Sequence, residues 1–445
     1  MSQHTRTTRR SPRTALRLTA IAAIAGMALT ACAVDPADNT PEGPDGDAPA
    51  GKAEIKFSWW GSDTRHELTQ EVLDNFMVKY PDITVVSDFT DWGGYWDKLA
   101  TTVAGGDTPD IFMQEERYLR DYNERDIMAD LSQYEIDTSA IDETILATGQ
   151  IDGGQYAIPT GVNVYAIAAN PRVFEDAGLE VPDDTTWTWE EFADLAIEVG
   201  ASGEDVYGMQ DHGSNEAGFN VFARQRGESL YTEDGGLGYE DQTLIDWWNI
   251  ALELQEKGGQ PAAAETVEIG DRGPEQSLLG TGKGAMMATW TNQLTAIANA
   301  AGEELKLMRW PGESQHERTG MYFKPALYAS MSSSTEHPEE AAKFLDFMLN
   351  SETAGEIILA DLGLPANLDV RATVAELLPE EEKQSADFVE DLQDEIIDGP
   401  PVPPVGAGEV AAVLGRLNTE VLFERMTPEE AATQFRAEVE GIIGG

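Results

Sequence analysis

The chain has 445 residues, of which 41% are hydrophobic and 25% are charged. This length is too great for one ordinary domain and suits two, and the composition allows a substantial core. The formal net charge is −52. So acidic a surface repels phosphate backbones and anionic lipid heads, which argues against nucleic-acid binding. We interpret the charge as a source of solubility, with steering of a cationic ligand as the alternative.

Residues 1–31 differ from the rest of the chain in charge. They contain five arginines and no acid, whereas the remainder has 24 Lys+Arg against 81 Asp+Glu, a net charge of −57. An apolar run from Leu18 to Leu29 follows the basic stretch. It has about the length of a signal-peptide core and is shorter than the roughly 20 residues of a membrane-spanning helix. We therefore predict that residues 1–31 are a signal peptide.

The only cysteine of the chain, Cys32, follows Leu29-Thr30-Ala31 directly. This sequence resembles the bacterial lipobox, which implies a lipoprotein signal in which Cys32 is acylated by fatty acids such as palmitate. Two or more acyl chains hold a protein stably on a membrane. A coincidental cysteine in a secretory signal is the alternative, and Arg9-Arg10 leaves open whether export is general or twin-arginine. The prolines and acids of residues 32–52 predict a disordered tether.

Alternating strands and helices are expected from residue 53 onward. Ile55, Phe57 and Trp59 alternate with polar residues, the period of a strand, and a helical pattern with one apolar face follows. The expected elements are a strand over 55–59, a helix over 65–80, a strand over 83–89, a helix over 96–104 and a strand over 109–113. This order predicts an α/β fold with a parallel sheet.

Further helices are expected over 191–199, 243–257, 338–349 and 428–443, and a buried strand over 285–289. The last helix begins with Thr427-Pro428-Glu429-Glu430, a capping box with proline at the first helical position.

Five groups of motifs occur in order along the chain. They are Trp59-Trp60-Gly61-Ser62; Trp92 to Leu99 with 104–110; Asp152 to Pro159 with 170–179 and 186–192; Gly282 to Trp290; and His337 to Leu345 with 363–365. Each motif is weak alone, but their order and spacing resemble the family of bacterial extracellular solute-binding proteins that includes the maltose-binding type. The resemblance covers nearly the whole chain after residue 52.

The resemblance implies a periplasmic-binding-protein-like fold with two hinge-linked α/β lobes. The first lobe is expected over 53–160 and 318–362, and the second over 161–317 and 363–445. The chain is expected to cross between the lobes near 159–163, 309–322 and 363–365. Such lobes close on a ligand, which shifts a population from open to closed.

The implied function is that of the substrate-binding subunit of an ABC importer, which delivers a mono- or oligosaccharide to a permease and its ATPase. A polyamine, amino acid or peptide is the alternative solute, and a secreted carbohydrate-active enzyme is the distant alternative. We expect a monomer, lipid-anchored on the extracytoplasmic face of the membrane, with no enzymatic activity, no cofactor and no metal.

A sugar site needs flat aromatic surfaces and planar polar groups at strand ends that face the cleft. The candidates from the first lobe are Trp60, Arg65, Trp92, Tyr95, Gln114 and Glu115. The candidates from the second lobe are Asn163, Tyr165, Asp211, Trp290, Asn292, Trp310 and Tyr322. Trp290 matches a place where family members present an aromatic ring to sugar. By contrast, Trp187, Trp189, Trp247 and Trp248 are expected to pack in the core.

Glu115 and Arg65 bear on the identity of the solute. A carboxylate that accepts two hydroxyls fits a neutral sugar, whereas an unpaired Arg65 fits a carboxylate such as a uronic acid. The alternative is that both charges pair with each other or with their neighbours.

Motifs of other functions are incomplete or missing. Gly280 to Gly284 superficially resembles a phosphate-binding loop, but Ser277 stands where the first glycine is needed and Gly284 where Ser or Thr is needed. No G-x-S-x-G elbow occurs, and the five histidines lack metal-ligand spacing.

Overall fold

The computed structural model describes residues 52–61, 63–270, 272–316 and 318–444. The predicted signal peptide, the lipidation at Cys32 and the tether up to residue 51 lie outside the described residues. Within the described part, no helix is both long enough and apolar enough to cross a membrane.

The first lobe has the alternating strands and helices that the sequence predicts. The elements are β1 (Ala53–Trp60), α1 (Asp63–Lys79), β2 (Ile83–Thr90), α2 (Trp92–Gly105), β3 (Ile111–Gln114) and α3 (Glu116–Glu124). The strands are parallel in the order β2-β1-β3, which confirms the predicted sheet. Helix α2 begins at Trp92 rather than Trp96, because the Asp91 side chain accepts a hydrogen bond from the Gly94 amide at 3.0 Å.

The other elements of the first lobe are η1 (Leu131–Gln133), α4 (Glu143–Ala147), β4 (Gln150–Ile151), β5 (Gly154–Gln155), α11 (Pro338–Asn350), α12 (Glu352–Ile358), β13 (Leu364–Pro365) and α13 (Leu368–Leu377). The second lobe contains α5 (Pro171–Ala177), α6 (Trp189–Gly200), β7 (Tyr207–Met209), α7 (Glu216–Gln225), β8 (Ser229–Tyr231), β9 (Leu237–Gly238), α8 (Asp241–Lys257), α9 (Ala263–Gly270), η2 (Pro274–Gln276), β10 (Gly284–Trp290), η3 (Thr291–Gln293), α10 (Leu294–Ala301), β11 (Lys306–Met308), α14 (Glu380–Asp391), η4 (Ala407–Glu409), α15 (Val410–Leu422) and α16 (Pro428–Ile443).

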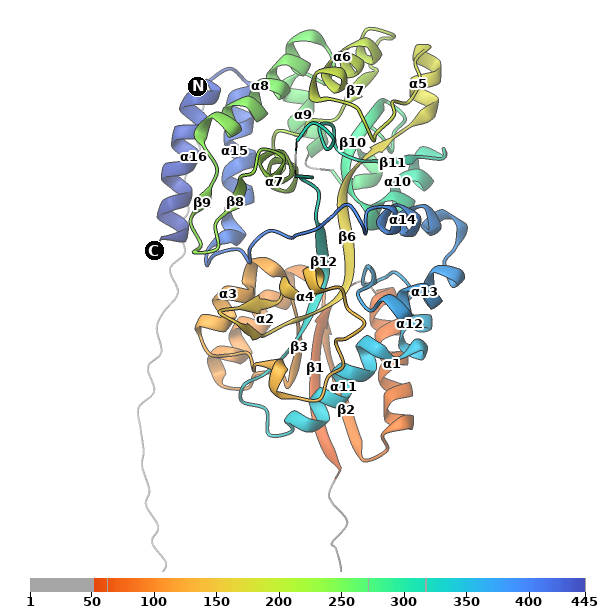
Figure 1. Ribbon diagram of the computed structural model, residues 1–445, viewed down its shortest axis with the longest axis vertical. Helices are drawn as coiled ribbons and strands as arrows, with labels where there is room; N and C mark the ends of the chain where they lie inside the picture. Colours follow the sequence, from red (N-terminus) through yellow and green to blue (C-terminus); the bar gives the residue numbers. More distant parts are fainter. Residues whose placement is uncertain (1–51, 62, 271, 317, 445) are drawn as a thin grey trace, which may run out of the picture. The chain divides into compact units, whose positions relative to one another are not determined.

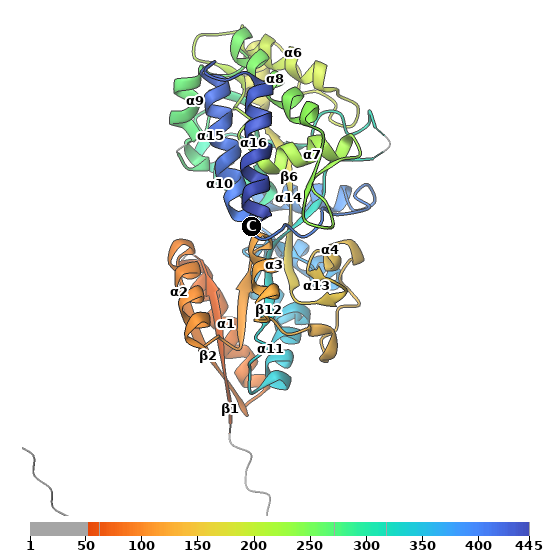
Figure 2. The same ribbon diagram turned by 90° about the vertical axis from the view of Figure 1, so that its left-hand side faces the viewer.

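Two long strands, β6 (Ile158–Ala169) and β12 (Phe323–Met331), connect the two lobes (Figures 1 and 2). They pair antiparallel in a sheet of order β2-β1-β3-β12-β6-β10-β7, and β13 and β11 also pair with β6. The three predicted crossing segments lie within or directly beside these paired strands. The two-lobed α/β prediction is therefore confirmed.

The strand pairing between β6 and β12 is irregular where the chain crosses. The register shifts between Pro325 and Leu327 and again between Leu327 and Tyr328. Beside this point a Cβ on Gly161 would lie 2.3 Å from the Leu362 carbonyl oxygen, so only glycine allows this close approach of β6 to the segment before β13.

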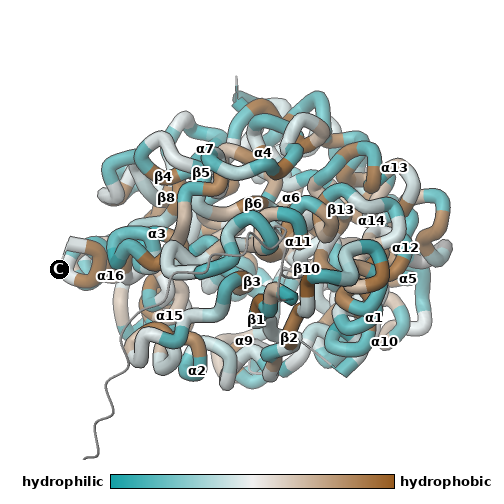
Figure 3. The backbone as a smooth tube through the Cα atoms, turned by 90° about the horizontal axis from the view of Figure 1, so that it is seen from below, coloured by the Kyte–Doolittle hydropathy of each residue, from teal (hydrophilic) through white to brown (hydrophobic). Residues whose placement is uncertain are grey.

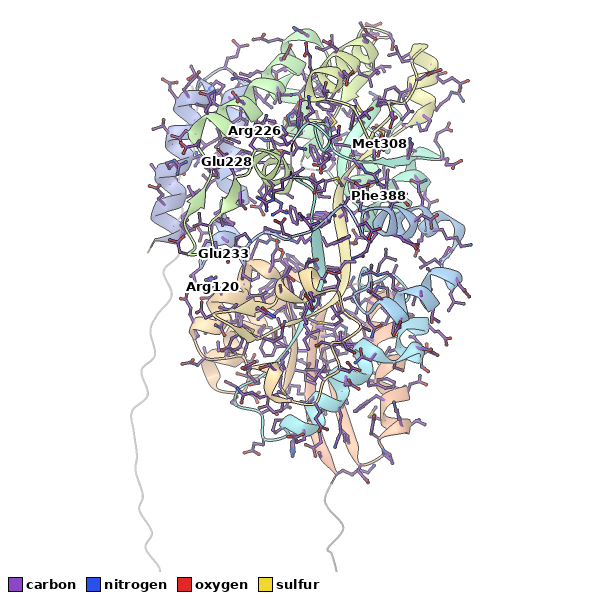
Figure 4. All side chains as sticks on the ribbon, viewed as in Figure 1. Arg120, Arg226, Glu228, Glu233, Met308 and Phe388 are labelled. Carbon is purple, nitrogen blue, oxygen red and sulfur yellow. The ribbon has the colours of Figure 1, made fainter. Side chains whose placement is uncertain are left out.

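Two consecutive helices lie on different lobes. Helix α13 packs on α12 and β13, whereas α14 packs on β11 and α10. Figure 4 shows Phe388 of α14 below Met308 of β11, both in the second lobe. We therefore propose that the first lobe continues to about residue 378, in place of the predicted boundary at 363.

The core consists of the inward faces of the strands and helices. Figure 3 shows hydrophobic segments on the central strands, among them β1 and β2, while hydrophilic segments prevail on the outer helices. The tryptophans predicted to pack in the core are buried, which confirms that prediction: Trp187, Trp189, Trp247 and Trp248.

Helix α16 begins with the predicted capping box. The Thr427 hydroxyl accepts from the Glu430 amide at 3.3 Å, and the Glu430 carboxylate accepts from the Thr427 amide at 3.1 Å. Thr427→Ala should lower the free energy of unfolding by about 1 kcal/mol. The control Thr433→Ala, in the same helix, removes only a hydroxyl that donates to the Glu429 carbonyl. Equal urea midpoints for the two variants would contradict a stabilising cap.

Candidate ligand-binding cleft

A cavity of about 260 Å³ lies where the two lobes meet. It is lined by Trp60, Arg65, Trp92, Glu115, Asn163, Trp290, Asn292, Gln293, Lys324, Pro325, Ala326, Leu327 and Asp361. Most of these residues stand at strand ends or just beyond them, the usual place of a ligand in open α/β sheets. We call this cavity the cleft.

Aromatic rings from both lobes line the cleft. Trp60 ends β1 and packs edge-on against Trp92 at the start of α2, with 5.1 Å between ring centroids. Trp92 is 42% exposed, although its ring belongs to this cluster. On the second lobe, Trp290 ends β10 and packs on Tyr165 at 4.8 Å. These rings give the cleft flat apolar surfaces on both sides.

Trp60 faces the cleft because of strand alternation. The preceding Trp59 packs on Phe57 at 5.0 Å on the other side of the sheet, and its indole Nε1 donates to His66 at 3.1 Å. Successive side chains of a strand point to opposite faces, so burial of Trp59 directs Trp60 toward the opposite side.

A compact ion-pair cluster lies at the floor of the cleft. Two of its members, Glu115 and Lys324, line the cleft, and the other two, Glu116 and Arg117, line the small cavity of about 60 Å³ beside it. Lys324 Nζ lies 3.1 Å from Glu115 Oε1 and 2.8 Å from Glu116 Oε1, and Arg117 Nε lies 3.0 Å from Glu115 Oε2. The Glu115 carboxylate also accepts from the Arg117 amide at 2.9 Å as the N-cap of α3. We call these four residues the floor cluster.

The floor cluster is well compensated although it is largely buried. Burial would raise the pKa of Glu115, but Lys324 and Arg117 outweigh it and lower that pKa to about 2. Burial likewise would lower the pKa of Lys324, but Glu116 and Glu115 raise it above its usual value. Glu115 and Lys324 are therefore both ionised at neutral pH. The Lys324 ammonium also lies 5.3 Å from the centre of the Trp290 ring, a cation–π contact.

Arg65 lies on another part of the wall and is paired with Asp361. Its Nε donates to Asp361 Oδ2 at 2.6 Å and its guanidinium also donates to the Asp361 carbonyl at 2.7 Å. Arg65 therefore pairs with Asp361, whereas Glu115 pairs with Lys324 and Arg117.

Seven of the thirteen predicted site residues line the cleft: Trp60, Arg65, Trp92, Glu115, Asn163, Trp290 and Asn292. The other six do not, namely Tyr95, Gln114, Tyr165, Asp211, Trp310 and Tyr322. Tyr95 is a core residue whose hydroxyl donates to the Met113 carbonyl at 2.7 Å. Trp310 is also fully buried and donates from its indole nitrogen to the Tyr165 carbonyl at 3.0 Å.

Tyr165 and Gln114 lie behind the cleft wall. Tyr165 is covered by Trp290 and supports that ring from below, and burial raises its pKa. Gln114 is fully buried at the end of β3.

Asp211 and Tyr322 line two other cavities. Asp211 borders a cavity of about 350 Å³ within the second lobe, where its carboxylate accepts from the Gly213 amide and from Asn418. Tyr322 borders a cavity of about 60 Å³ that adjoins the cleft behind Trp290 and Lys324. That small cavity also contains Glu216, whose pKa burial raises to about 7.

Three polar residues of the cleft are not among the predicted ones: Gln293, Lys324 and Asp361. Lys324 follows the predicted crossing segment 309–322 by two residues, and that proximity is the only signal for it in the sequence. The cleft continues on its other side into a cavity of about 440 Å³ lined by Asn163, Asn292 and Thr295, among others.

A metal centre is not formed by the described side chains, since no three His, Cys, Asp or Glu residues among them are grouped to hold an ion.

Two α/β lobes joined by paired crossing strands, with an aromatic and polar cleft between them, define a binding protein of the periplasmic type. Residues 61–355 match the family model of the bacterial extracellular solute-binding proteins. The chain belongs to this family, as its motifs predict.

Three similar proteins illustrate the relationship. An extracellular solute-binding protein of family 1 from Alicyclobacillus acidocaldarius aligns with a TM-score of 0.73 and 26% identity, covering 89% of this chain and 100% of that one. A periplasmic oligogalacturonide-binding protein from Yersinia enterocolitica aligns with a TM-score of 0.75 and 22% identity, covering 88% and 99%. The erythritol/L-threitol-binding protein of Mycolicibacterium smegmatis is 25% identical over 295 residues, which are 58% of this chain and 60% of that one.

Proposed function

We propose that the protein captures a carbohydrate outside the cytoplasm by closure of its lobes and delivers it to the permease of an ABC importer. The observation that carries this proposal is the composition of the cleft. Trp60 and Trp92 on one lobe and Trp290 on the other offer flat apolar faces, and Asn163, Asn292 and Gln293 offer amides for hydroxyls.

The comparisons support this proposal. One similar protein is named for binding oligogalacturonides and another for erythritol and L-threitol, which are all polyhydroxylated solutes. The proteins compared are binding proteins, and the proposed role involves no chemistry on the solute. The partners of this role are the permease and ATPase subunits of the importer.

A polyamine, amino acid or peptide remains the alternative solute. The acidic net charge of the whole chain favours a cation, but the cleft itself does not, because Glu115 and Asp361 are both paired with basic side chains. A cationic ligand would have to displace one of these pairs.

A thermal-shift screen of residues 52–445 tests the proposal. The panel contains neutral mono-, di- and oligosaccharides, sugar alcohols, uronic acids, polyamines and amino acids. A ligand at 100 times its dissociation constant stabilises the folded state by about 2.7 kcal/mol. A shift with one group of carbohydrates supports the proposal, whereas shifts with polyamines or amino acids alone contradict it.

We further propose that Cys32 carries the lipid anchor. Cys32→Ala should move the full-length protein from the membrane fraction to the soluble fraction and abolish incorporation of labelled palmitate. The basis is that two or more acyl chains are needed for stable membrane attachment. Retention of the label in the variant would contradict the assignment. The control is Ser11→Ala, which alters the basic region before the apolar run and leaves Leu29 to Cys32 intact.

A further inference from the structure

We propose that the carbohydrate is uncharged, because every charged side chain that lines the cleft is already held by a partner of opposite sign. This inference rests on the proposed function and restricts it to neutral sugars and sugar alcohols.

The first pair is Arg65 with Asp361. A guanidinium binds a uronate through two parallel hydrogen bonds, which makes Arg65 the natural partner for an acidic sugar. Two of its nitrogens are instead used by Asp361, at 2.6 Å to the carboxylate and 2.7 Å to the carbonyl. Both side chains are largely buried, with 18% and 23% of their surfaces exposed.

The second group is the floor cluster. Lys324, 17% exposed, is held between Glu115 and Glu116, and Arg117 neutralises the second oxygen of Glu115, which is 7% exposed. Lys324, the cation of this cluster that lines the cleft, therefore has two carboxylates beside it. For the same reason Glu115 is not available to a ligand ammonium group.

The charges of these two groups cancel. Arg65, Lys324 and Arg117 contribute three positive charges, and the carboxylates Glu115, Glu116 and Asp361 contribute three negative ones. A uronate or an amino sugar would have to break one pair and leave the released partner desolvated and uncompensated, which is strongly unfavourable. Outside the cleft, the net charge of −52 also opposes the approach of an anion.

Hydroxyl groups do not meet this barrier. A sugar hydroxyl donates to the remaining lone pairs of Glu115 and Asp361 or accepts from Lys324 without separating the ion pairs. Ion pairs of this kind therefore act as polar contacts for a neutral solute and select against a charged one.

The test compares matched neutral and charged sugars by calorimetry on the mature protein. The pairs are galactose with galacturonic acid, glucose with glucuronic acid, and galactobiose with digalacturonic acid. Glucosamine and putrescine are then tested as single cationic ligands. If the screen identifies another carbohydrate, that carbohydrate and its uronate form the pair. We expect the neutral member to bind at least tenfold more tightly. Tighter binding of a uronate or of glucosamine would overturn this inference but leave carbohydrate capture standing. Binding of putrescine with no binding of any sugar would overturn both.

Asp361→Asn provides a second test, because it removes the carboxylate that holds Arg65. We expect the affinity for the uronate to rise about tenfold, equivalent to about 1.4 kcal/mol, and the preference for the neutral sugar to shrink accordingly. Asp176→Asn makes the same charge change at the exposed Arg172–Asp176 pair and should alter neither affinity.

A variant that fails to fold is recognised by its melting curve. In that case Glu115→Gln, which removes a carboxylate from Lys324 and Arg117, serves the same purpose at the floor cluster. Unchanged discrimination between the neutral sugar and the uronate in the folded variant would overturn the inference.

Discussion

Trp290→Ala should weaken carbohydrate binding by about 1–3 kcal/mol, or roughly five- to 150-fold in Kd. The ring of Trp290 forms the aromatic surface of the second lobe in the cleft and is fixed there by Tyr165 beneath it and by Lys324 at its face. Truncation removes the flat surface on which a sugar ring stacks. Calorimetric titration measures the loss directly.

The matched control for this prediction is Trp290→Phe, which keeps a smaller flat ring in the same place and should retain part of the affinity. Melting curves distinguish an aromatic residue that stabilises the fold from one that contacts the solute. If the melting temperature of Trp290→Ala falls sharply while the affinity per folded molecule stays unchanged, Trp290 stabilises the lobe and does not contact the solute.

Lys324→Met should lower the free energy of unfolding by about 3–5 kcal/mol. The substitution keeps the aliphatic stem but removes the ammonium group between Glu115 and Glu116, which leaves two carboxylates close together in a largely buried site. Urea unfolding at pH 7 measures the effect. The control is Lys257→Met, which breaks an exposed pair with Glu253 and should lower the stability far less, because solvent screens exposed ion pairs. Equal losses for the two variants would contradict the role of the floor cluster.

Lys324→Met should also change how the free energy of unfolding depends on pH in the acid range. The pKa of Glu115 is about 2 in the folded protein, against an ordinary value of 4.5. A carboxyl with a lowered pKa stabilises the fold above its unfolded pKa, and that contribution is lost as the pH falls from about 4.5 toward 2. Without Lys324 the pKa of Glu115 rises, so the stability of the variant should fall less steeply than that of the wild type over this window.

The secondary structure of the first lobe could be predicted because it is encoded locally. The strand period around Phe57 and the helical period from Arg65 are both visible over short windows, and the capping box before Pro428 is a motif of four residues. Hydrophobic periodicity does not predict the start of α2, because its first turn contains two glycines and is capped by the Asp91 side chain, which accepts from the Gly94 amide.

The cleft could be predicted only in part, because residue type does not distinguish a cleft aromatic from a core one. Tyr95 and Trp310 resemble cleft residues in the sequence, yet each is buried with its polar atom on a backbone carbonyl. Trp60 and Trp290, which do line the cleft, each end a strand.

The ion pairs could not be predicted, because their partners are far apart in the sequence. Arg65 and Asp361 are separated by 296 positions, and Lys324 and Glu115 by 209. No local pattern connects such residues, and with 81 acids in the chain almost any carboxylate is a conceivable partner.

The irregular pairing of β6 and β12 lies in the wall of the cleft itself. Ala326 and Leu327 line the cavity and also stand at the two register shifts. The ladder of hydrogen bonds between the strands is interrupted at such shifts, and the strand bends there. If the lobes close as proposed, a solute seated on these residues touches the segment that bends. Binding strength and the ease of bending are then coupled, since the observed affinity scales with the population of the binding-competent form. Substitutions at Tyr328, which stands at the second register shift but does not line the cavity, can therefore change solute affinity while every side chain that meets the sugar stays the same.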